Sequence, residues 1–256
     1  MKGVISMKVK VLKNSDELGK AAAAFSAEII RQAIEKDGKA RIILSTGASQ
    51  FDTLKYLVKE DINWSKVEMF HLDEYINLPE THPASFRKYL KERFVSIVNP
   101  GKVFFVDGEG DVESKILALS KEVTREPIHL GLIGIGENAH IAFNDPPADF
   151  ETTKPFIIVN LDDKCKKQQV GEGWFPTIDD VPKQAISMSV HQIMQCNVIL
   201  SSVPYKVKAN AIKITLENDL TNMIPATMLK THKNANIYVD EDSVSAVDKN
   251  VLAKYL

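Results

Sequence analysis

The chain has 256 residues, of which 44% are apolar and 26% charged, a composition typical of a soluble globular protein with one large domain or two small ones. Its formal net charge of -2 argues against nucleic acid or an anionic membrane as the main partner. No apolar run approaches the roughly 20 residues that span a bilayer, and the N-terminal segment lacks the apolar core of a signal peptide.

The two cysteines, Cys165 and Cys196, form no CxxC pair and have no metal-ligand spacing. Cysteines placed in this way are typical of free thiols in a reducing compartment. Because the chain also lacks a recognisable leader sequence, we expect a cytoplasmic protein.

Segments typical of helices alternate with segments typical of strands along the chain. The Ala-rich run over 16–37 predicts a helix that stops at Gly38, and apolar residues three and four apart predict two further helices, one over 51–58 and one that begins at Pro83. Short apolar runs bounded by polar residues or glycine are typical of buried strands. Such runs lie at 41–45, 67–72, 103–106, 128–135, 156–160, 185–190, 197–203 and 236–239, and a further helix is expected over about 205–217.

This alternation predicts an α/β fold: a Rossmann-like, open, mostly parallel twisted sheet with helices on both faces. No internal repeat, low-complexity tract or Pro/Ser-rich linker interrupts the chain, so we expect a single domain over 1–256. The longest segment without a clear period is 162–180, which includes Trp174 and Phe175. Because long irregular segments in compact domains are often functional, this segment is a candidate lid.

A candidate phosphate site follows the first buried strand. The segment consists of Ser45, Thr46, Gly47, Ala48 and Ser49, between this strand and a helix, where a glycine and small hydroxyl residues can direct backbone N–H groups toward a phosphate. The Gly-Lys-Ser/Thr ending of a nucleotide-binding P-loop is missing, so ATP hydrolysis is not expected. An ordinary helix cap would explain the same residues. Lys206, where a later strand gives way to a helix, could hold a phosphate from the far side or could be solvated.

A candidate base follows the next strand. Asp73 ends an apolar run and precedes Glu74 and Tyr75. Ligands of open α/β sheets bind at the carboxyl ends of the strands, and a carboxylate there can act as a base if burial and neighbouring groups tune its pKa. A solvated acidic turn is the alternative interpretation.

The stretch 134–145 carries Gly136, Asn138, His140 and Asp145 directly after an apolar run. A carboxylate near a histidine can fix its tautomer and orientation for acid–base chemistry, although a lone histidine in an α/β protein is usually structural. The third glycine of a dinucleotide fingerprint is absent, so NAD is not expected.

Four segments, taken together, resemble the glucosamine-6-phosphate deaminase family, within the superfamily that also holds the 6-phosphogluconolactonases. They are the Thr-Gly loop at 46–47, the Asp-Glu-Tyr run at 73–75, the Leu-Pro-x-x-His-Pro-x-Ser run at 78–85 and the Gly-x-Gly-x-Asn-x-His-Ile-x-Phe-Asn run at 134–144. The resemblance covers most of the chain and ends near 205–206. The combination is specific, whereas any one segment alone would not be.

The resemblance implies an enzyme that isomerises and deaminates glucosamine 6-phosphate to fructose 6-phosphate and ammonia. Asp73 would be the base that moves a proton between C2 and C1, and His140 would assist opening of the sugar ring. Asn138 and Asp145 would orient the histidine and the reacting groups. Substrate and phosphate binding would fall to Thr46, Gly47, Ala48, Ser49, Gly136 and Lys206. The reaction needs no metal and no organic cofactor, and the expected partner is a small-molecule sugar phosphate.

The chain departs from the family pattern at several of these positions. Asn138 stands where many members carry Asp, and Asp145 stands where Glu is usual. Ala139 replaces a glycine, which costs on the order of 1 kcal/mol if the backbone there needs a positive φ. An arginine that binds phosphate in well-studied members has no counterpart in the run 171–175.

Three other functions stay open at this point. The first is a lactonase that uses His140 to activate water, although the run 141–145 continues unlike the Thr-Ala-Ser-like sequence usual in lactonases. The second is a non-catalytic sugar-phosphate sensor, which would need neither Asp73 nor His140. The third is a deaminase for a different amino-sugar phosphate. Family members occur as monomers and as larger assemblies, so a homo-oligomer is also left open.

Overall fold

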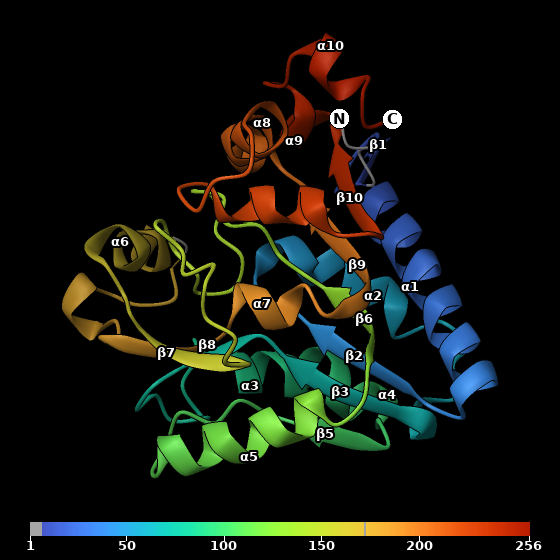
Figure 1. Cartoon of the computed structure of the whole chain (residues 1–256). Coiled ribbons are helices and arrows are strands. Elements are labelled where there is room, and N and C mark those ends of the chain that lie inside the picture. The colour runs from blue at the N-terminus through green and yellow to red at the C-terminus, as the bar shows by residue number, and fades with distance from the viewer. Residues whose placement is uncertain (1–6, 172) are drawn as a thin grey trace.

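The computed structural model describes residues 7–171 and 173–256, and a seven-stranded sheet forms its centre (Figure 1). The strands lie in the order β1 (Lys8–Leu12), β10 (Ala235–Asp240), β9 (Cys196–Val203), β6 (Ile128–Leu132), β2 (Ala40–Leu44), β3 (Val67–His71) and β5 (Lys102–Phe104). Each neighbouring pair in this sheet is parallel. The predicted open, mostly parallel α/β sheet is therefore confirmed.

Helices cover both faces of the sheet. Successive residues of a strand point to opposite sides, so the apolar strands present buried side chains to helices on each face. Ile42 and Leu44 of β2 belong to the apolar cluster that includes Ile30 of α1 (Ser15–Asp37), whereas Ile43 belongs to the cluster that includes Ile212 of α8 (Ala209–Glu217). The helices are α1 (Ser15–Asp37), α2 (Phe51–Leu57), α3 (Phe86–Leu90), α4 (Ser96–Val98), α5 (Val112–Thr124), α6 (Asp163–Gly171), α7 (Val190–Ile193), α8 (Ala209–Glu217), α9 (Glu241–Val244) and α10 (Lys249–Leu252). Within the described residues, none of them is long and apolar enough to span a membrane.

A second, three-stranded antiparallel sheet stands beside the first. It consists of β4 (Asp73–Tyr75), β8 (Gln184–Met188) and β7 (Phe156–Asn160), with β8 in the middle. Leu72 alone separates the end of β3 from β4, so the chain passes directly from the large sheet into the small one. In Figure 1 the small sheet and α6 lie on the side of the molecule away from α1.

Several elements differ from the sequence-based expectations. The segment 162–180 is not irregular throughout, because it contains α6 and a 3₁₀ turn at Ile178–Asp180. The helix expected from Pro83 begins at Phe86, since the Oγ of Ser85 accepts a hydrogen bond from the backbone N–H of Lys88 at 3.3 Å and caps the helix there. The strands at 156–160 and 185–190 belong to the small sheet.

Candidate active site

One cavity of about 210 Å³ lies where residues that follow β2, β3, β6 and β9 come together. Seven residues that the sequence indicated line it: Thr46, Gly47, Ala48, Ser49, Asp73, Gly136 and His140. The parallel strands end at the same edge of the sheet, which is why segments far apart in the sequence meet here. Asn138 and Asp145 do not line the cavity, and they contact His140 instead.

The turn over 46–49 is held in shape from two sides. Gly47 has φ +96°, a left-handed conformation that favours glycine, and the hydroxyl of Tyr89 donates to its carbonyl oxygen at 3.0 Å. The Nε2 of Gln50 donates to the carbonyl oxygen of Ser202 on β9 at 3.2 Å. The 3₁₀ helix Ala48–Gln50 starts in this turn, and the first N–H groups of a helix have no partner within it. The turn therefore presents a preformed backbone to an anion.

Ser45, the first residue of the candidate segment 45–49, is a further candidate binding residue, although the expected phosphate contacts were assigned to residues 46–49 alone. Its side chain lines the cavity and is 5% exposed, and its hydroxyl has no hydrogen-bond partner within the described part of the chain. A buried hydroxyl without a partner costs free energy, so a ligand in the cavity would satisfy it.

Asp73 lies at the boundary between the two sheets, where it is 8% exposed and pairs with Ser187 across β4 and β8. Burial raises the pKa of Asp73 to about 8, and the neighbouring carboxylate of Glu74 adds to the shift. A carboxylate with such a pKa is a much stronger base than a solvated aspartate.

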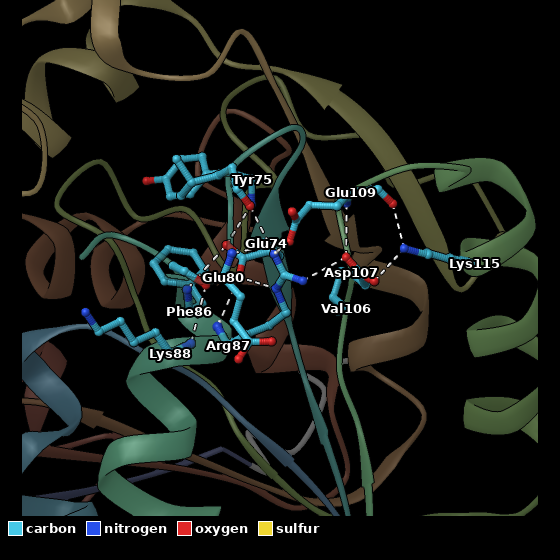
Figure 2. A network of polar contacts seen from close by, with 12 residues as sticks. Glu74, Tyr75, Glu80, Phe86, Arg87, Lys88, Val106, Asp107, Glu109 and Lys115 are labelled. Atoms are coloured by element: carbon cyan, nitrogen blue, oxygen red, sulfur yellow. Dashed lines mark hydrogen bonds and ion pairs between the residues drawn. The ribbon is translucent and has the colours of Figure 1, made fainter. Parts of the chain in front are cut away.

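Glu74, on the opposite face of β4, anchors this strand to the start of α3 (Figure 2). Its Oε2 accepts hydrogen bonds from the Ser85 hydroxyl at 2.8 Å and from the backbone N–H of Arg87 at 3.0 Å. The Arg87 guanidinium contacts Glu74 at 3.2 Å and also reaches Asp107 and Glu109, each at 2.8 Å. This buried network fixes the backbone that carries Asp73 without placing Glu74 in the cavity.

His140, Asn138 and Asp145 form one connected group. The Nδ1 of His140 lies 3.0 Å from Oδ1 of Asp145, and the Nδ2 of Asn138 donates to the same oxygen at 3.0 Å. The Oδ1 of Asn138 accepts from the backbone N–H of His140 at 3.1 Å. Burial works to raise the pKa of Asp145, but the contacts with His140 and Asn138 outweigh it and hold this pKa below its usual value.

The backbone around His140 has two special positions. A Cβ on Gly136 would lie 2.2 Å from Nε2 of His140, so only glycine lets the imidazole ring pack here. Ala139 has φ +64° and is fully buried, which confirms that the backbone is left-handed at the position where the family pattern has glycine.

The structure corrects the expectation that Lys206 faces the cavity. The Nζ of Lys206 donates to the hydroxyl of Ser245 at 2.7 Å, and the cavity is lined by Lys208 instead. Lys206–Lys208 forms a 3₁₀ turn, in which residues two apart point in different directions. Lys208 is the only lysine or arginine among the described residues that line the cavity.

The segment 162–180 supplies part of the cavity wall through Gln169 and Trp174. The hydroxyl of Tyr75 donates to Oε1 of Gln169 at 2.7 Å, and the ring of Phe175 packs edge-on against Tyr75 with centroids 5.5 Å apart. Phe175 also stacks on His82 at 5.2 Å. Aromatic and polar contacts therefore attach this segment to the strand that carries Asp73.

Within the described residues, no group of three or more His, Cys, Asp or Glu side chains could hold a metal ion. Cys165 and Cys196 are free and buried.

Comparisons with known proteins agree with this geometry. The sequence model of the family "Glucosamine-6-phosphate isomerases/6-phosphogluconolactonase" matches residues 13–238. The chain is 30% identical over 243 residues to a glucosamine-6-phosphate deaminase of Streptococcus uberis, covering 94% of this chain and 100% of that one. It is 32% identical over 249 residues to that of Thermoanaerobacter pseudethanolicus, covering 94% and 95%.

Solved structures give the same result. A monomeric glucosamine-6-phosphate deaminase superposes with a TM-score of 0.86 at 28% identity, covering 94% of this chain and 100% of that one. A 6-phosphogluconolactonase of Shewanella baltica shares the fold, with a TM-score of 0.77 at 17% identity, covering 93% and 100%. The resemblance inferred from the sequence is confirmed, and the chain belongs to the family of glucosamine-6-phosphate isomerases and 6-phosphogluconolactonases.

Proposed function

We propose that this chain is a glucosamine-6-phosphate deaminase, which converts glucosamine 6-phosphate and water into fructose 6-phosphate and ammonia. The observation that carries the proposal is one cavity with a buried carboxylate of raised pKa, Asp73, and an imidazole paired with a carboxylate, His140 with Asp145. Relatives of this name align with almost the whole chain. The lactonase structures are less similar in sequence and support the fold alone.

His140 is proposed to open the sugar ring. Asp145, whose pKa is lowered, is ionised at neutral pH, and its Oδ1 lies 3.0 Å from Nδ1 of the imidazole. The carboxylate therefore favours the tautomer that carries its proton on Nδ1, which leaves Nε2 unprotonated. Nε2 can then take the proton of the anomeric hydroxyl and return it to the ring oxygen as the C1–O5 bond breaks. The product of this step is the open-chain aldehyde.

Asp73 is proposed to move the proton between C2 and C1. Its carboxylate takes the C2 proton, and the electron pair shifts onto the C1 oxygen, which takes a proton from the C2 ammonium group and becomes the hydroxyl of an enolamine. Return of the proton to C1 then gives an imine at C2, and addition of water to this imine releases ammonia and the ketose. A positioned base of this kind typically contributes about 10²–10⁴-fold in rate.

The protonation state of Asp73 depends on the substrate. Because its pKa is about 8, the carboxyl group of the empty site holds a proton at neutral pH. A C2 ammonium group nearby favours the ionised carboxylate, as any opposite charge within a few ångströms does. An amino sugar therefore activates its own base, which a lactone without an amino group would not do.

The phosphate is proposed to bind at the turn over 46–49, with the Ser45 hydroxyl and the Lys208 ammonium as further donors. Backbone N–H groups at the start of a helix and a lysine are a common combination for phosphate. Holding the phosphate away from the reacting carbons lets remote binding free energy orient C1 and C2 between Asp73 and His140.

The segment 162–180 is proposed to be a lid that excludes water from the cavity, with Gln169 and Trp174 facing the substrate. We further propose that the whole chain acts as one domain in the cytoplasm, in the breakdown of amino sugars. Its free, buried cysteines agree with a reducing compartment.

The test is the release of ammonia from glucosamine 6-phosphate by the purified protein, with fructose 6-phosphate measured in the same samples. Equal amounts of both products are expected. Hydrolysis of 6-phosphogluconolactone is measured in parallel. A folded protein that releases neither product, or that hydrolyses the lactone instead, contradicts the proposal.

A further inference from the structure

Gln169 is a buried polar residue of the cavity wall to which the proposed mechanism assigns no hydrogen bond with the substrate. It lies on α6, its side chain is 8% exposed, and it lines the cavity. The hydroxyl of Tyr75 donates to its Oε1 at 2.7 Å. The backbone carbonyl of Gln169 accepts from the N–H of Trp174 at 3.1 Å, which ties it to the other cavity residue of this segment.

The bond from Tyr75 determines which half of the amide is available to a ligand. A glutamine amide has one acceptor oxygen and two N–H donors on Nε2. Because Tyr75 donates to the oxygen, the two donors on Nε2 are left for a ligand: the contacts of Gln169 with the described residues use Oε1 and the backbone carbonyl oxygen. Donors on a largely buried side chain need an acceptor, and the cavity is where one can bind.

The position of Gln169 along the sheet edge indicates which part of the substrate it meets. Tyr75 is two residues after Asp73 on β4, so both side chains point to the same face of that strand. Lys208 follows β9, and the strands β6 and β2 lie between β9 and β3. In the order of the strands, the Tyr75 contact therefore places Gln169 nearer to Asp73 than to Lys208.

A second contact places α6 beside the acid–base groups. Cys165 is one helical turn before Gln169, on the same face, and its side chain is 2% exposed. Burial raises the pKa of this thiol, and the adjacent carboxylate of Asp145 raises it further. One face of α6 thus contacts both acid–base groups of the proposed mechanism: Gln169 contacts the strand that carries Asp73, and Cys165 lies beside Asp145, the partner of His140.

We propose that Gln169 is a specificity-determining residue that donates a hydrogen bond from Nε2 to a hydroxyl or carbonyl oxygen on the reacting half of the sugar, and not to the phosphate. This inference rests on the proposed amino-sugar phosphate substrate. A neutral donor suits the place, because a permanent cation so close to Asp73 would lower its pKa even in the empty site, whereas the C2 ammonium does so only when the amino sugar is bound. The amide can bind an oxygen of the sugar without changing the charge around the carboxylate of Asp73.

The decisive variant is Gln169→Glu, which keeps an oxygen for the Tyr75 hydroxyl but replaces the donor group by an acceptor. Gln169→Met removes the amide with little change of size and adds no charge. Gln184→Glu is the matched control, since Gln184 is exposed on β8 and its Nε2 donates only to Asn160 at 2.9 Å among the described residues.

Two ligands separate the two ends of the cavity. The first is 2-amino-2-deoxyglucitol 6-phosphate, the reduced open-chain form of the sugar, which cannot isomerise. The second is inorganic phosphate, measured by its displacement of the first. Calorimetry should show the alditol phosphate bound about 10- to 100-fold more weakly by Gln169→Glu and Gln169→Met. Phosphate should bind within about twofold of wild type, and Gln184→Glu should leave both affinities unchanged.

The outcomes distinguish this inference from the proposed reaction. Alditol affinity within twofold of wild type in both Gln169 variants, or equal losses for alditol and phosphate, overturns the role of Gln169. Ammonia release by the wild-type protein is measured on the same preparation. If no ammonia is released but alditol binding depends on Gln169, the proposed reaction fails and the inference stands. If the wild-type protein does not bind the alditol, both fail.

Discussion

The Nδ1 of His140 and the Oδ1 of Asp145 are 3.0 Å apart, and Asn138 donates to the same carboxylate oxygen. This arrangement accounts for two departures from the family pattern at once. An amide at position 138 can donate to Asp145 and accept from the His140 backbone, whereas an ionised aspartate there could only accept. The amide therefore suits a carboxylate that stands this close.

The proposed base is tested most directly by Asp73→Asn, which keeps the shape of the side chain and removes its basicity. We expect turnover of glucosamine 6-phosphate to fall by about 10³-fold or more, because the C2 proton has no other acceptor in the mechanism. The affinity for 2-amino-2-deoxyglucitol 6-phosphate should change far less. Wild-type-like turnover of this variant would show that another group is the base.

The raised pKa of Asp73 predicts how activity depends on pH. The base works in its ionised form, so kcat/KM should rise with pH and level off above about 8. Initial rates between pH 6 and 10 check this. A profile that is flat between pH 6 and 8 contradicts the assignment.

The same pKa predicts a pH dependence of stability. The folded-state pKa of Asp73, about 8, lies above the roughly 3.9 of an unfolded aspartate. The contribution of this carboxyl group to the free energy of unfolding is therefore fully present below about pH 4, and it is lost as the pH rises from there through about 8. Relative to Asp73→Asn, the free energy of unfolding of the wild type should fall by up to roughly 1.4 kcal/mol per pH unit within that window. Urea denaturation of both proteins at pH 5 and pH 8 measures the difference. An equal pH dependence in the two proteins would rule out a raised pKa.

Two glycines of one motif form a matched pair for the packing of His140. A Cβ on Gly136 would lie 2.2 Å from the imidazole, whereas the nearest atom to a Cβ on Gly134 is Cβ of Ser45 at 3.6 Å, an ordinary contact. Gly136→Ala should displace the ring and lower kcat by about 10²-fold, because small misplacements of a catalytic group are costly. Gly134→Ala should cost less than about tenfold. Similar effects of the two substitutions would contradict the proposed packing.

The part of the site that local sequence could predict is the part that depends on strand ends. Thr46, Asp73 and His140 all follow apolar runs, and parallel strands bring such residues to one edge whatever the details of packing. The main sheet was predictable for the same reason, since buried parallel strands are short apolar runs flanked by helices.

The residues that the sequence did not reveal depend on geometry that arises only in the folded chain. Gln169 faces the cavity because α6 docks against Tyr75, a contact between residues 94 positions apart. The antiparallel pairing of β4 with β8 is likewise long-range, and the three residues of β4 are too few to show the alternation that predicts a strand. Which of Lys206 and Lys208 lines the cavity depends on how one short 3₁₀ turn directs its side chains.

Lys206 and Lys208 therefore offer a final matched comparison, two residues apart in one turn. Lys208 lines the cavity, whereas the ammonium of Lys206 contacts Ser245. Lys208→Met should raise KM for glucosamine 6-phosphate about 10- to 100-fold, which is the effect of losing one charge-assisted hydrogen bond to phosphate. It should lower the affinity for inorganic phosphate by the same factor. Lys206→Met should leave both within about twofold of wild type. The reverse ranking, with Lys206→Met the more damaging substitution, would return the phosphate contact to Lys206 and require the 3₁₀ turn to rotate when substrate binds.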